Sequence, residues 1–482
     1  MLNPKSTDKA EQKDPRKFPN RRAGTTRALP VIMPDAAGID IGATSLYAAV
    51  PNDRADPAVR MFETFTPDLL ALARWLKECG VRTVAMESTG VYWIPVFQIL
   101  ESAGIEVCLV NARHVKNVPG RKTDVSDCQW LQYLHAVGLL RGSFRPEEAV
   151  CAVRSILRHR DTLVHYASSH VQHMQKALTQ MNLHLHHVVS DITGKTGLAI
   201  LDAIVAGERD PAKLALLRDR RIKAPGPVVE KALVGDYRAE HLFTLRQALA
   251  IWRHYQEQIA DCDHEIERLL EAFDPPSDSP SHTTPSKDSS EADRPDLHKG
   301  SARTSGIVWY DPLHNTLEGR LRSVLGVNLA TIPGIAQSTA AVLFSEIGRD
   351  LSAFPTASHF ASWLGLCPDN RISGGKILSV ITRKVRSRAA TALRLAANSL
   401  RNSKSALGDF FRRINARLGA PKAITAVAHK LARIVYTLIT KGTDYDESVF
   451  VQNEEKYQQK RLNRLRKQAA ELGYVIAECP VS

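Results

Sequence analysis

Four acidic residues in the N-terminal part of the chain could together hold metal ions: Asp40, Glu87, Asp124 and Asp127. Carboxylate oxygens are ligands that Mg²⁺ prefers. Four carboxylates can hold two Mg²⁺ ions about 3.5–4 Å apart, which clamp the attacking and leaving oxygens of a phosphodiester. The set therefore predicts metal-dependent cleavage of a nucleic-acid backbone.

Asp40 and Glu87 both stand in apolar runs of the kind that form buried strands. Asp40 lies at the centre of the run 38–42, between two isoleucines and, outside those, two glycines. A carboxylate in such a run is costly to bury without a partner. We interpret the glycines as positions where a bulky ligand, such as metal-bound phosphate, could approach the backbone. Glu87 ends the run 81–87, and catalytic carboxylates are common at strand ends.

Asp124 and Asp127 are spaced i, i+3. If Thr123 caps a helix that runs to about Leu140, both acids lie on one face of its first turn. Acids in a first helical turn also have an ordinary explanation, because they complement the helix dipole. The order of the whole set is more specific. An Asp in the first strand, a Glu at the end of a later strand and an Asp-x-x-Asp helix follow one another in RNase H-like nucleases.

The run around Asp40 is also similar to the first motif of actin-like ATPases and sugar kinases. Those proteins require a later glycine-rich Asp-x-Gly phosphate loop and an adenosine pocket in a second α/β half. Neither pattern follows Arg154, so this class is disfavoured.

A second set of residues, near the C-terminus, could contact or attack a phosphate. Ser373 precedes two glycines and lies between Arg371 and Lys376, which predicts an exposed hydroxyl with freedom to approach a phosphate, although most Ser-Gly pairs are plain turns. In the segment 332–335, Gly334 follows a proline. This segment resembles a helix-hairpin-helix turn, whose backbone amides bind phosphate without reading sequence.

The surroundings of Ser373 are strongly basic. Between Arg371 and Arg433 there are fifteen Lys and Arg residues and one acid, Asp409. A solvated helix normally mixes both signs, so this imbalance predicts a surface that contacts phosphates and loses affinity as salt rises. The net charge of +13 favours the same kind of partner. Besides Arg371 and Lys376, the candidate nucleic-acid-binding residues are Arg383, Lys384, Arg386 and Arg388.

Apolar periodicity predicts the elements that position these residues. From Asp35 to about Arg145, β-rich runs alternate with helical ones, which predicts an α/β domain around a mixed sheet. The expected strands lie in 36–50, 59–65, 81–86 and 105–110, and the expected helices in 67–79 and 93–103. From about Arg154 the period is helical. The segment 243–273 carries a sustained apolar stripe, with 171–188 as its candidate partner, in either an intramolecular hairpin or an oligomer seam.

Composition disfavours several classes of protein. No uninterrupted apolar run reaches the roughly 18 residues that span a bilayer, and the N-terminus lacks the apolar core of a signal peptide. The seven cysteines include no CxxC pair, which fits reduced thiols in a cytoplasm and indicates no zinc site. We therefore expect a cytoplasmic protein with no membrane partner.

The two sets of motifs, in this order, resemble the DEDD transposases of the IS110 family of insertion sequences, which are bridge-RNA-guided recombinases. The resemblance covers roughly residues 36–440, although the family's Lys-x-Gly-Asn stretch is not present in 383–388. The motifs that carry it are Gly38-Ile39-Asp40-Ile41-Gly42, Met86-Glu87-Ser88-Thr89-Gly90, Lys122-Thr123-Asp124-Val125-Ser126-Asp127, Ile332-Pro333-Gly334-Ile335, Gly365-Leu366-Cys367-Pro368 and Ser373-Gly374-Gly375-Lys376.

With this resemblance, the expected fold class is α/β plus all-α. The expected order is a disordered basic arm (1–34), a RuvC-like (RNase H-like) DEDD catalytic domain (35–150), a helical, coiled-coil middle (151–273), a disordered insertion (274–305), a helical C-terminal transposase domain with a helix-hairpin-helix-like element (317–445) and a helical tail (446–482).

The resemblance also implies a mechanism of DNA recombination. Ser373 occupies the position of the family's nucleophilic serine, which joins the metal site. A phosphoserine link keeps the phosphodiester for rejoining, whereas attack by water would discard it. The family assembles as tetramers in which one protomer's serine domain completes another's metal site, with two Mg²⁺ ions per composite site. An element-encoded bridge RNA selects donor and target DNA by base pairing.

Two other functions stay open at this point. The first is a Mg²⁺-dependent junction-resolving nuclease of RuvC type, which would use the four acids and water. The second is a catalytically decayed protein that only binds nucleic acid.

Overall fold

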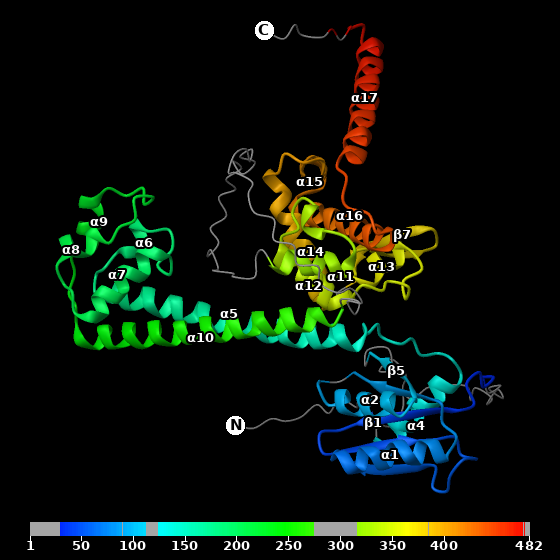
Figure 1. Cartoon of the computed structure of the whole chain (residues 1–482). Coiled ribbons are helices and arrows are strands. Elements are labelled where there is room, and N and C mark those ends of the chain that lie inside the picture. Colours follow the sequence, from blue (N-terminus) through cyan, green and yellow to red (C-terminus); the bar gives the residue numbers. More distant parts are fainter. Residues whose placement is uncertain are drawn as a thin grey trace, which may run out of the picture. The chain divides into compact units, whose positions relative to one another are not determined.

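The computed structural model describes residues 29–88, 90–111, 124–273, 316–383, 385–475 and 477. The chain divides into two compact units, residues 1–144 and 145–482, and each is described by itself (Figure 1). Most of the basic arm, Thr123 and the insertion 274–305 lie outside the described residues.

The N-terminal unit is built on a five-stranded mixed sheet, as the alternation of strands and helices predicts. The sheet has the order β3-β2-β1-β4-β5; β2 is antiparallel to β1 and β3, whereas β4 is parallel to β1 and β5. The strands are β1 (Ala36–Ile41), β2 (Ser45–Ala49), β3 (Val59–Glu63), β4 (Thr83–Glu87) and β5 (Glu106–Val110). The predicted run 36–50 is thus two strands joined by a tight turn.

Helices cover both faces of this sheet. Helices α1 (Thr66–Glu78) and α2 (Trp93–Ser102) bury their apolar stripes against the face that carries Ile39 and Met86. Helix α4 (Asp124–Ala136) packs on the other face, against β1, β2 and β4. The predicted helix therefore exists and ends at Ala136 rather than near Leu140, followed by Gly138 in the left-handed region.

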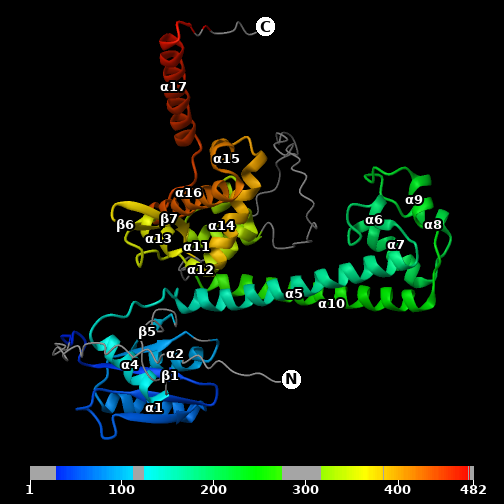
Figure 2. The same ribbon diagram turned by 180° about the vertical axis from the view of Figure 1, so that it is seen from behind.

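The second unit begins with a long antiparallel helical hairpin. Helices α5 (Glu148–Gln180) and α10 (Ala239–Glu271) pack along their length (Figure 2). Arg160 of α5 forms an ion pair with the buried Asp263 of α10. Two arrangements were predicted for these helices, an intramolecular hairpin or an oligomer seam, and within this chain they form the hairpin. The first helix begins earlier than the predicted 171–188 and ends at Gln180.

Four short helices lie at the far end of this hairpin and share a core with it. They are α6 (Leu185–Val188), α7 (Lys195–Ala206), α8 (Pro211–Leu216) and α9 (Gly226–Ala232). Figures 1 and 2 both show them at the end opposite the C-terminal helices.

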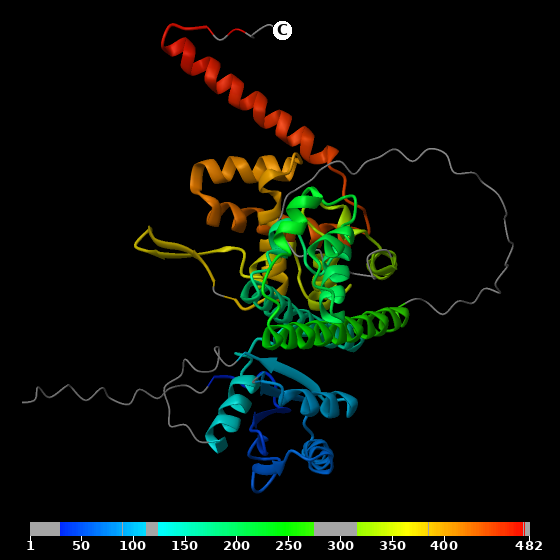
Figure 3. The ribbon, with the colours of Figure 1, turned by 90° about the vertical axis from the view of Figure 1, so that its left-hand side faces the viewer.

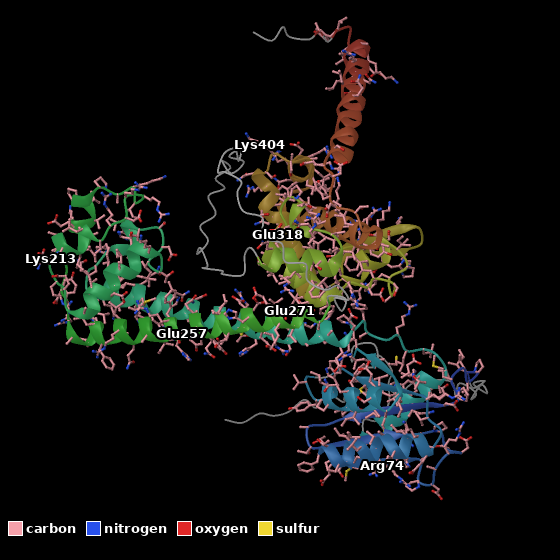
Figure 4. The ribbon with its side chains drawn as sticks, viewed as in Figure 1. Arg74, Lys213, Glu257, Glu271, Glu318 and Lys404 are labelled. Atoms are coloured by element: carbon pink, nitrogen blue, oxygen red, sulfur yellow. The ribbon has the colours of Figure 1, made fainter. Side chains whose placement is uncertain are left out.

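The C-terminal helices pack at the other end of the hairpin. The elements are α11 (Thr316–Leu325), η2 (Leu329–Thr331), α12 (Gln337–Ile347), α13 (Ala357–Trp363), α14 (Arg388–Ser399), η3 (Leu400–Asn402), α15 (Ala406–Leu418), α16 (Ala420–Lys441) and α17 (Ser448–Glu471). Arg154 of α5 donates to the carbonyl of Ser345 in α12 at 2.7 Å. Arg320 pairs with Glu271 at the end of α10 at 2.9 Å, and Figure 4 labels this glutamate.

The C-terminal region is not wholly helical, and the prediction of an all-helical domain was wrong on this point. Residues Pro368–Ser373 (β6) and Lys376–Thr382 (β7) form an antiparallel hairpin that extends away from the helices (Figure 3).

Helix α16 is long and apolar enough to span a bilayer by length and composition, with a mean hydropathy of 1.2 over its best window. It is the one such helix among the described residues. Val427, Leu431 and Val435 of this helix are buried within the protein, as expected for the core helix of a helical domain.

Candidate active site

The sheet register brings Asp40 and Glu87 to the same level. Strands β1 and β4 are parallel, with Gly38 opposite Ala85 and Ile39 opposite Met86, so Asp40 and Glu87 are the next residues on their strands. Neighbouring residues at one level of a sheet point to the same face. Ile39 and Met86 face α1 and α2. Asp40 and Glu87 therefore both point to the face that α4 covers, and both are partly exposed.

Helix α4 runs antiparallel to β1 and β4. Near the helix C-terminus, His135 Nε2 and Thr83 Oγ1 at the start of β4 lie 2.8 Å apart. One turn earlier, Gln132 Nε2 donates to the carbonyl of Ala36 at 3.2 Å. The first turn of α4 must therefore lie toward the ends of β1 and β4, where Asp40 and Glu87 are.

Gly38 serves packing, so its interpretation as a point of ligand approach was wrong, whereas Gly42 serves a turn. A Cβ atom on Gly38 would lie 2.3 Å from both Cys128 O and Gln132 N, which means that α4 rests directly on this residue. A Cβ atom on Gly42 would lie 2.6 Å from Ser45 O, across the turn between β1 and β2.

The electrostatics of Cys128 report which acids surround it. Burial, the largest cause, and the negative charges of Asp40 and Asp127 together raise the pKa of this thiol to about 12. Cys128 in α4 therefore lies within electrostatic range of an acid from β1 and an acid from α4. Asp127 is partly exposed, whereas the side chain of Asp124, the first residue of α4, lies outside the described part.

The fold thus gathers three of the four predicted acids around one end of the sheet: Asp40, Glu87 and Asp127. Partly exposed carboxylates on a rigid sheet and a helix are a donor set that fits Mg²⁺, which takes one or two carboxylates per ion and keeps waters. Asp124 adds a fourth carboxylate at the start of the same helix.

Ser373 lies at the end of β6, opposite Lys376 in β7. The connecting Gly374 and Gly375 have φ of +54° and +76°, the combination that a two-residue type I′ turn requires. Ser373 and Lys376 are both exposed, as predicted. Several apolar side chains of the hairpin are exposed as well: Ile372, Leu378 and Ile381.

Two of the predicted nucleic-acid-binding arginines have partners inside the second unit. Arg383 donates to the carbonyl of Ser362, at the end of α13. Arg388, the first residue of α14, pairs with Asp161 of α5 and lies 3.8 Å from Glu346 of α12. These contacts hold the end of the β6–β7 hairpin and the start of α14 in place.

Of the other predicted basic residues, two are exposed and two have side chains outside the described part. Lys376 and Arg386 are exposed, whereas the side chains of Arg371 and Lys384 lie outside the described part. Gly334 has a φ of +88°, and a Cβ atom there would lie 2.8 Å from Ala396 O and from Leu400. The glycine is required where this turn packs on α14, and phosphate binding by the turn stays a prediction.

A groove along α16 was missed from the sequence. It has a volume of about 1460 Å³ and is bordered by the base of the hairpin, α15, and the segment after α16. Its floor is mostly apolar, and basic residues recur along it: Lys422, Lys430, Arg433 and Lys441. The helical spacing of these residues in 420–441 was the available signal.

Comparison with known proteins gives two family models that match in chain order. A DEDD transposase model of IS110 elements, described as "Transposase", matches residues 37–183, which contain the four acids. A model described as "Transposase IS116/IS110/IS902 family" matches residues 327–412, which contain Gly334 and Ser373. Two separate parts of the chain are thus similar to IS110-type transposases, in the same order along the sequence.

Two curated relatives agree with this similarity. The chain is 32% identical over 130 residues to the putative transposase y4pF/y4sB of Sinorhizobium fredii, covering 25% of this chain and 32% of the relative. It is 29% identical over 137 residues to the insertion element IS110 uncharacterized 43.6 kDa protein of Streptomyces coelicolor, covering 27% and 34%. The chain spans about a third of the length of the curated relatives it matches.

Proposed function

We propose that this protein is a transposase that cleaves and rejoins DNA strands with a RuvC-like metal site and a serine nucleophile. The observation that carries the proposal is that Asp40, Glu87 and the first turn of α4 meet at one end of a mixed sheet. The same chain presents an exposed serine at a tight turn. The similarity to IS110-type transposases supports the pairing of these two features.

The acids would hold the ions, and Mg²⁺ bound there would supply positive charge to the phosphodiester that is cut. Asp40 and Glu87 would face the ion from the sheet, and Asp124 and Asp127 from the helix. The strands fix the separation of the first two carboxylates, because the register of β1 and β4 places them side by side. The α4 backbone, seated on Gly38, fixes the second pair.

Ser373 Oγ would attack the phosphorus, forming an Oγ–P bond while one P–O bond to a deoxyribose breaks. The proton that Ser373 Oγ loses is balanced by the proton that the leaving deoxyribose oxygen gains, and the phosphoserine ester keeps the energy of the phosphodiester for rejoining. Lys376, opposite the serine, and the exposed Arg386 would contact phosphates near it.

The proposal includes partners that follow the family resemblance. The serine and the acids belong to separate compact units, which is compatible with a composite site formed in a homo-tetramer. A structured bridge RNA would select donor and target DNA, so that the basic surfaces need to read only nucleic-acid shape. The chain's net charge of +13 supports binding to both kinds of nucleic acid.

The test uses the full chain with Mg²⁺, its element's DNA ends and the RNA transcribed beside the gene. Ser373→Ala should abolish the covalent protein–DNA adduct, detected as a shifted band on a denaturing gel, because no other group replaces Oγ. Asp127→Asn should reduce strand cleavage by a factor of about 10² or more, since one charged metal ligand is lost.

Matched variants separate chemistry from folding. Ser358→Ala removes another exposed serine of the same unit, and Asp68→Asn removes a first-turn acid on the opposite face of the sheet. Both should keep activity within a factor of about two of the original chain. Cleavage that persists in Ser373→Ala would favour the junction-resolving nuclease. No Mg²⁺-dependent cleavage by the original chain would favour the decayed binding protein.

A further inference from the structure

Three histidines gather at the far end of the α5–α10 hairpin, away from the elements used above. His184, His186 and His187 lie on and just before α6, and one ring nitrogen of each falls within 4.8 Å of the others. The rings of His186 and His187 are 4.3 Å apart between centroids, and those of His184 and His187 are 4.9 Å apart. Figures 1 and 2 show α6 among α7, α8 and α9.

The tautomer of His184 is set by its neighbour. His184 Nε2 lies 3.0 Å from Asn182 Oδ1, and because that oxygen can only accept, Nε2 must carry the hydrogen. Nδ1 of the neutral ring is then an unprotonated lone pair. It is buried and has no hydrogen-bond partner among the described residues. A hydrogen bond at one ring nitrogen with a free lone pair at the other is the arrangement of a metal-ligating histidine.

His186 offers a second nitrogen of the same kind. Its Nδ1 is also buried and has no hydrogen-bond partner within the described part of the chain. Buried polar atoms in folded proteins nearly always have a partner, and an orphan often marks an absent ion.

We propose that His184, His186 and His187 form a site for a transition-metal ion of the Zn²⁺ class, separate from the carboxylate site. Imidazole suits Zn²⁺, Ni²⁺ and Cu²⁺, whereas Mg²⁺ prefers oxygen ligands. Zn–N bonds of about 2.0–2.1 Å place the nitrogens of a tetrahedral set roughly 3.4 Å apart. The exposed ring of His187 can rotate inward to close the present spacing. Solvent would complete the coordination.

The ion would add to the contacts that hold α6 in place. Helix α6 has four residues and no side-chain cap. It is joined to α9 by the bond from His184 N to Ala232 O at 2.8 Å. Three ligands from one short segment would hold it in a single conformation against the shared core of the hairpin. The metal ion would therefore fix the far end of the α5–α10 hairpin, and this role does not depend on the chemistry of the N-terminal unit.

The experiment titrates the full chain, without a histidine tag, with Co²⁺ in excess Mg²⁺. The excess Mg²⁺ occupies carboxylate ligands and leaves imidazoles to Co²⁺. We expect one Co²⁺ per chain, with the intense visible absorption of tetrahedral coordination, displaced by one equivalent of Zn²⁺. His187→Gln should weaken Co²⁺ binding at least tenfold. Because this side chain is exposed, the variant should keep the helical circular dichroism of the original chain.

The matched control is His159→Gln, an exposed histidine on α5 outside the cluster. It should bind Co²⁺ as the original chain does, which excludes general binding by the seventeen histidines. The proposal is overturned if the original chain gives no saturable tetrahedral spectrum. Equal Co²⁺ affinity of the original chain and the His187→Gln variant would overturn it too.

Discussion

The carboxylates lie on a packed sheet and helix, whereas the serine lies on an exposed two-stranded hairpin. Asp40 and Glu87 end two neighbouring strands of a five-stranded sheet, and α4 is seated on that sheet at Gly38. Ser373 ends a strand of a two-stranded hairpin whose Ile372 and Leu378 are exposed. A metal site needs carboxylates at fixed separations, which a packed sheet and helix supply. An isolated hairpin is only marginally stable, so Ser373 depends mainly on its turn.

The largest effect is expected from Gly38→Ala in the carboxylate region. The new methyl group would overlap backbone atoms of α4 at 2.3 Å, and neither the helix nor the central strand can move without disturbing the core. We expect the N-terminal unit to lose about 3 kcal/mol or more of stability. Urea unfolding followed by hydrogen exchange of β1 and α4 measures this loss.

The matched control is Gly319→Ala in α11, where a Cβ atom meets nothing within 4 Å. A helical alanine should be neutral or stabilising there, by up to about 1 kcal/mol. Equal stability of Gly38→Ala and the original chain would mean that α4 does not rest on β1 and that the carboxylates are not held together as described.

The elements of the carboxylate region could be predicted because local patterns govern them. Apolar runs indicated four strand segments, the first of which is two strands in the structure, and the spacing of Leu69, Leu72 and Leu76 indicated α1. The role of Gly38 could not be predicted in the same way. Its neighbours are Cys128 and Gln132, and a contact between residues so far apart in the chain follows only from the packed fold.

The candidate site shows the same limit. The residue types and their order identified the acids, but the common face of Asp40 and Glu87 depends on the register of two parallel strands. The β6–β7 hairpin was overlooked although Gly374-Gly375 between β-branched residues is a type I′ signal, because the basic and helical character of the surrounding region dominated the interpretation. The three histidines near α6 were not predicted as ligands, because the predicted metal site rested on the four acids and the spacing of the cysteines indicated no zinc site.

A change in the turn of the β6–β7 hairpin should lower covalent adduct formation without lowering the stability of the whole chain. Gly375→Val puts a β-branched residue at a φ of +76°, which costs about 1–2 kcal/mol in the left-handed region. The hairpin has little buried surface to offset this cost. We expect covalent adduct formation to fall at least tenfold while the melting temperature of the chain stays within a degree or two.

Gly374→Asn is the informative companion to this change. Asn-Gly is a preferred type I′ turn, so the variant should keep the hairpin and its activity. Hydrogen exchange of residues 368–382 should rise in Gly375→Val and stay unchanged in Gly374→Asn. A large drop in melting temperature for Gly375→Val would show that the hairpin is part of the folded core, and the contrast between the two regions would then fail.

The smallest effect concerns His135, which ties the far end of α4 to the start of β4. Burial lowers the pKa of this histidine, although the charge of Glu106 acts in the opposite direction. Its Nε2 lies 2.8 Å from Thr83 Oγ1, and the ring is 4% exposed. A histidine whose pKa is lower in the folded state than in the unfolded state takes up its proton more readily on unfolding. Its contribution is therefore complete above the unfolded pKa of about 6.5 and declines as the pH falls through and below that value.

Hydrogen exchange of α4 should consequently quicken, after correction for the intrinsic rate, between pH 7.5 and 5.5. His135→Gln should cost about 1 kcal/mol at pH 7.5 and remove most of this pH dependence, because a glutamine cannot take up a proton. A variant with the same acid sensitivity as the original chain would assign the effect to other groups, and the anchoring of α4 would then not depend on pH through His135.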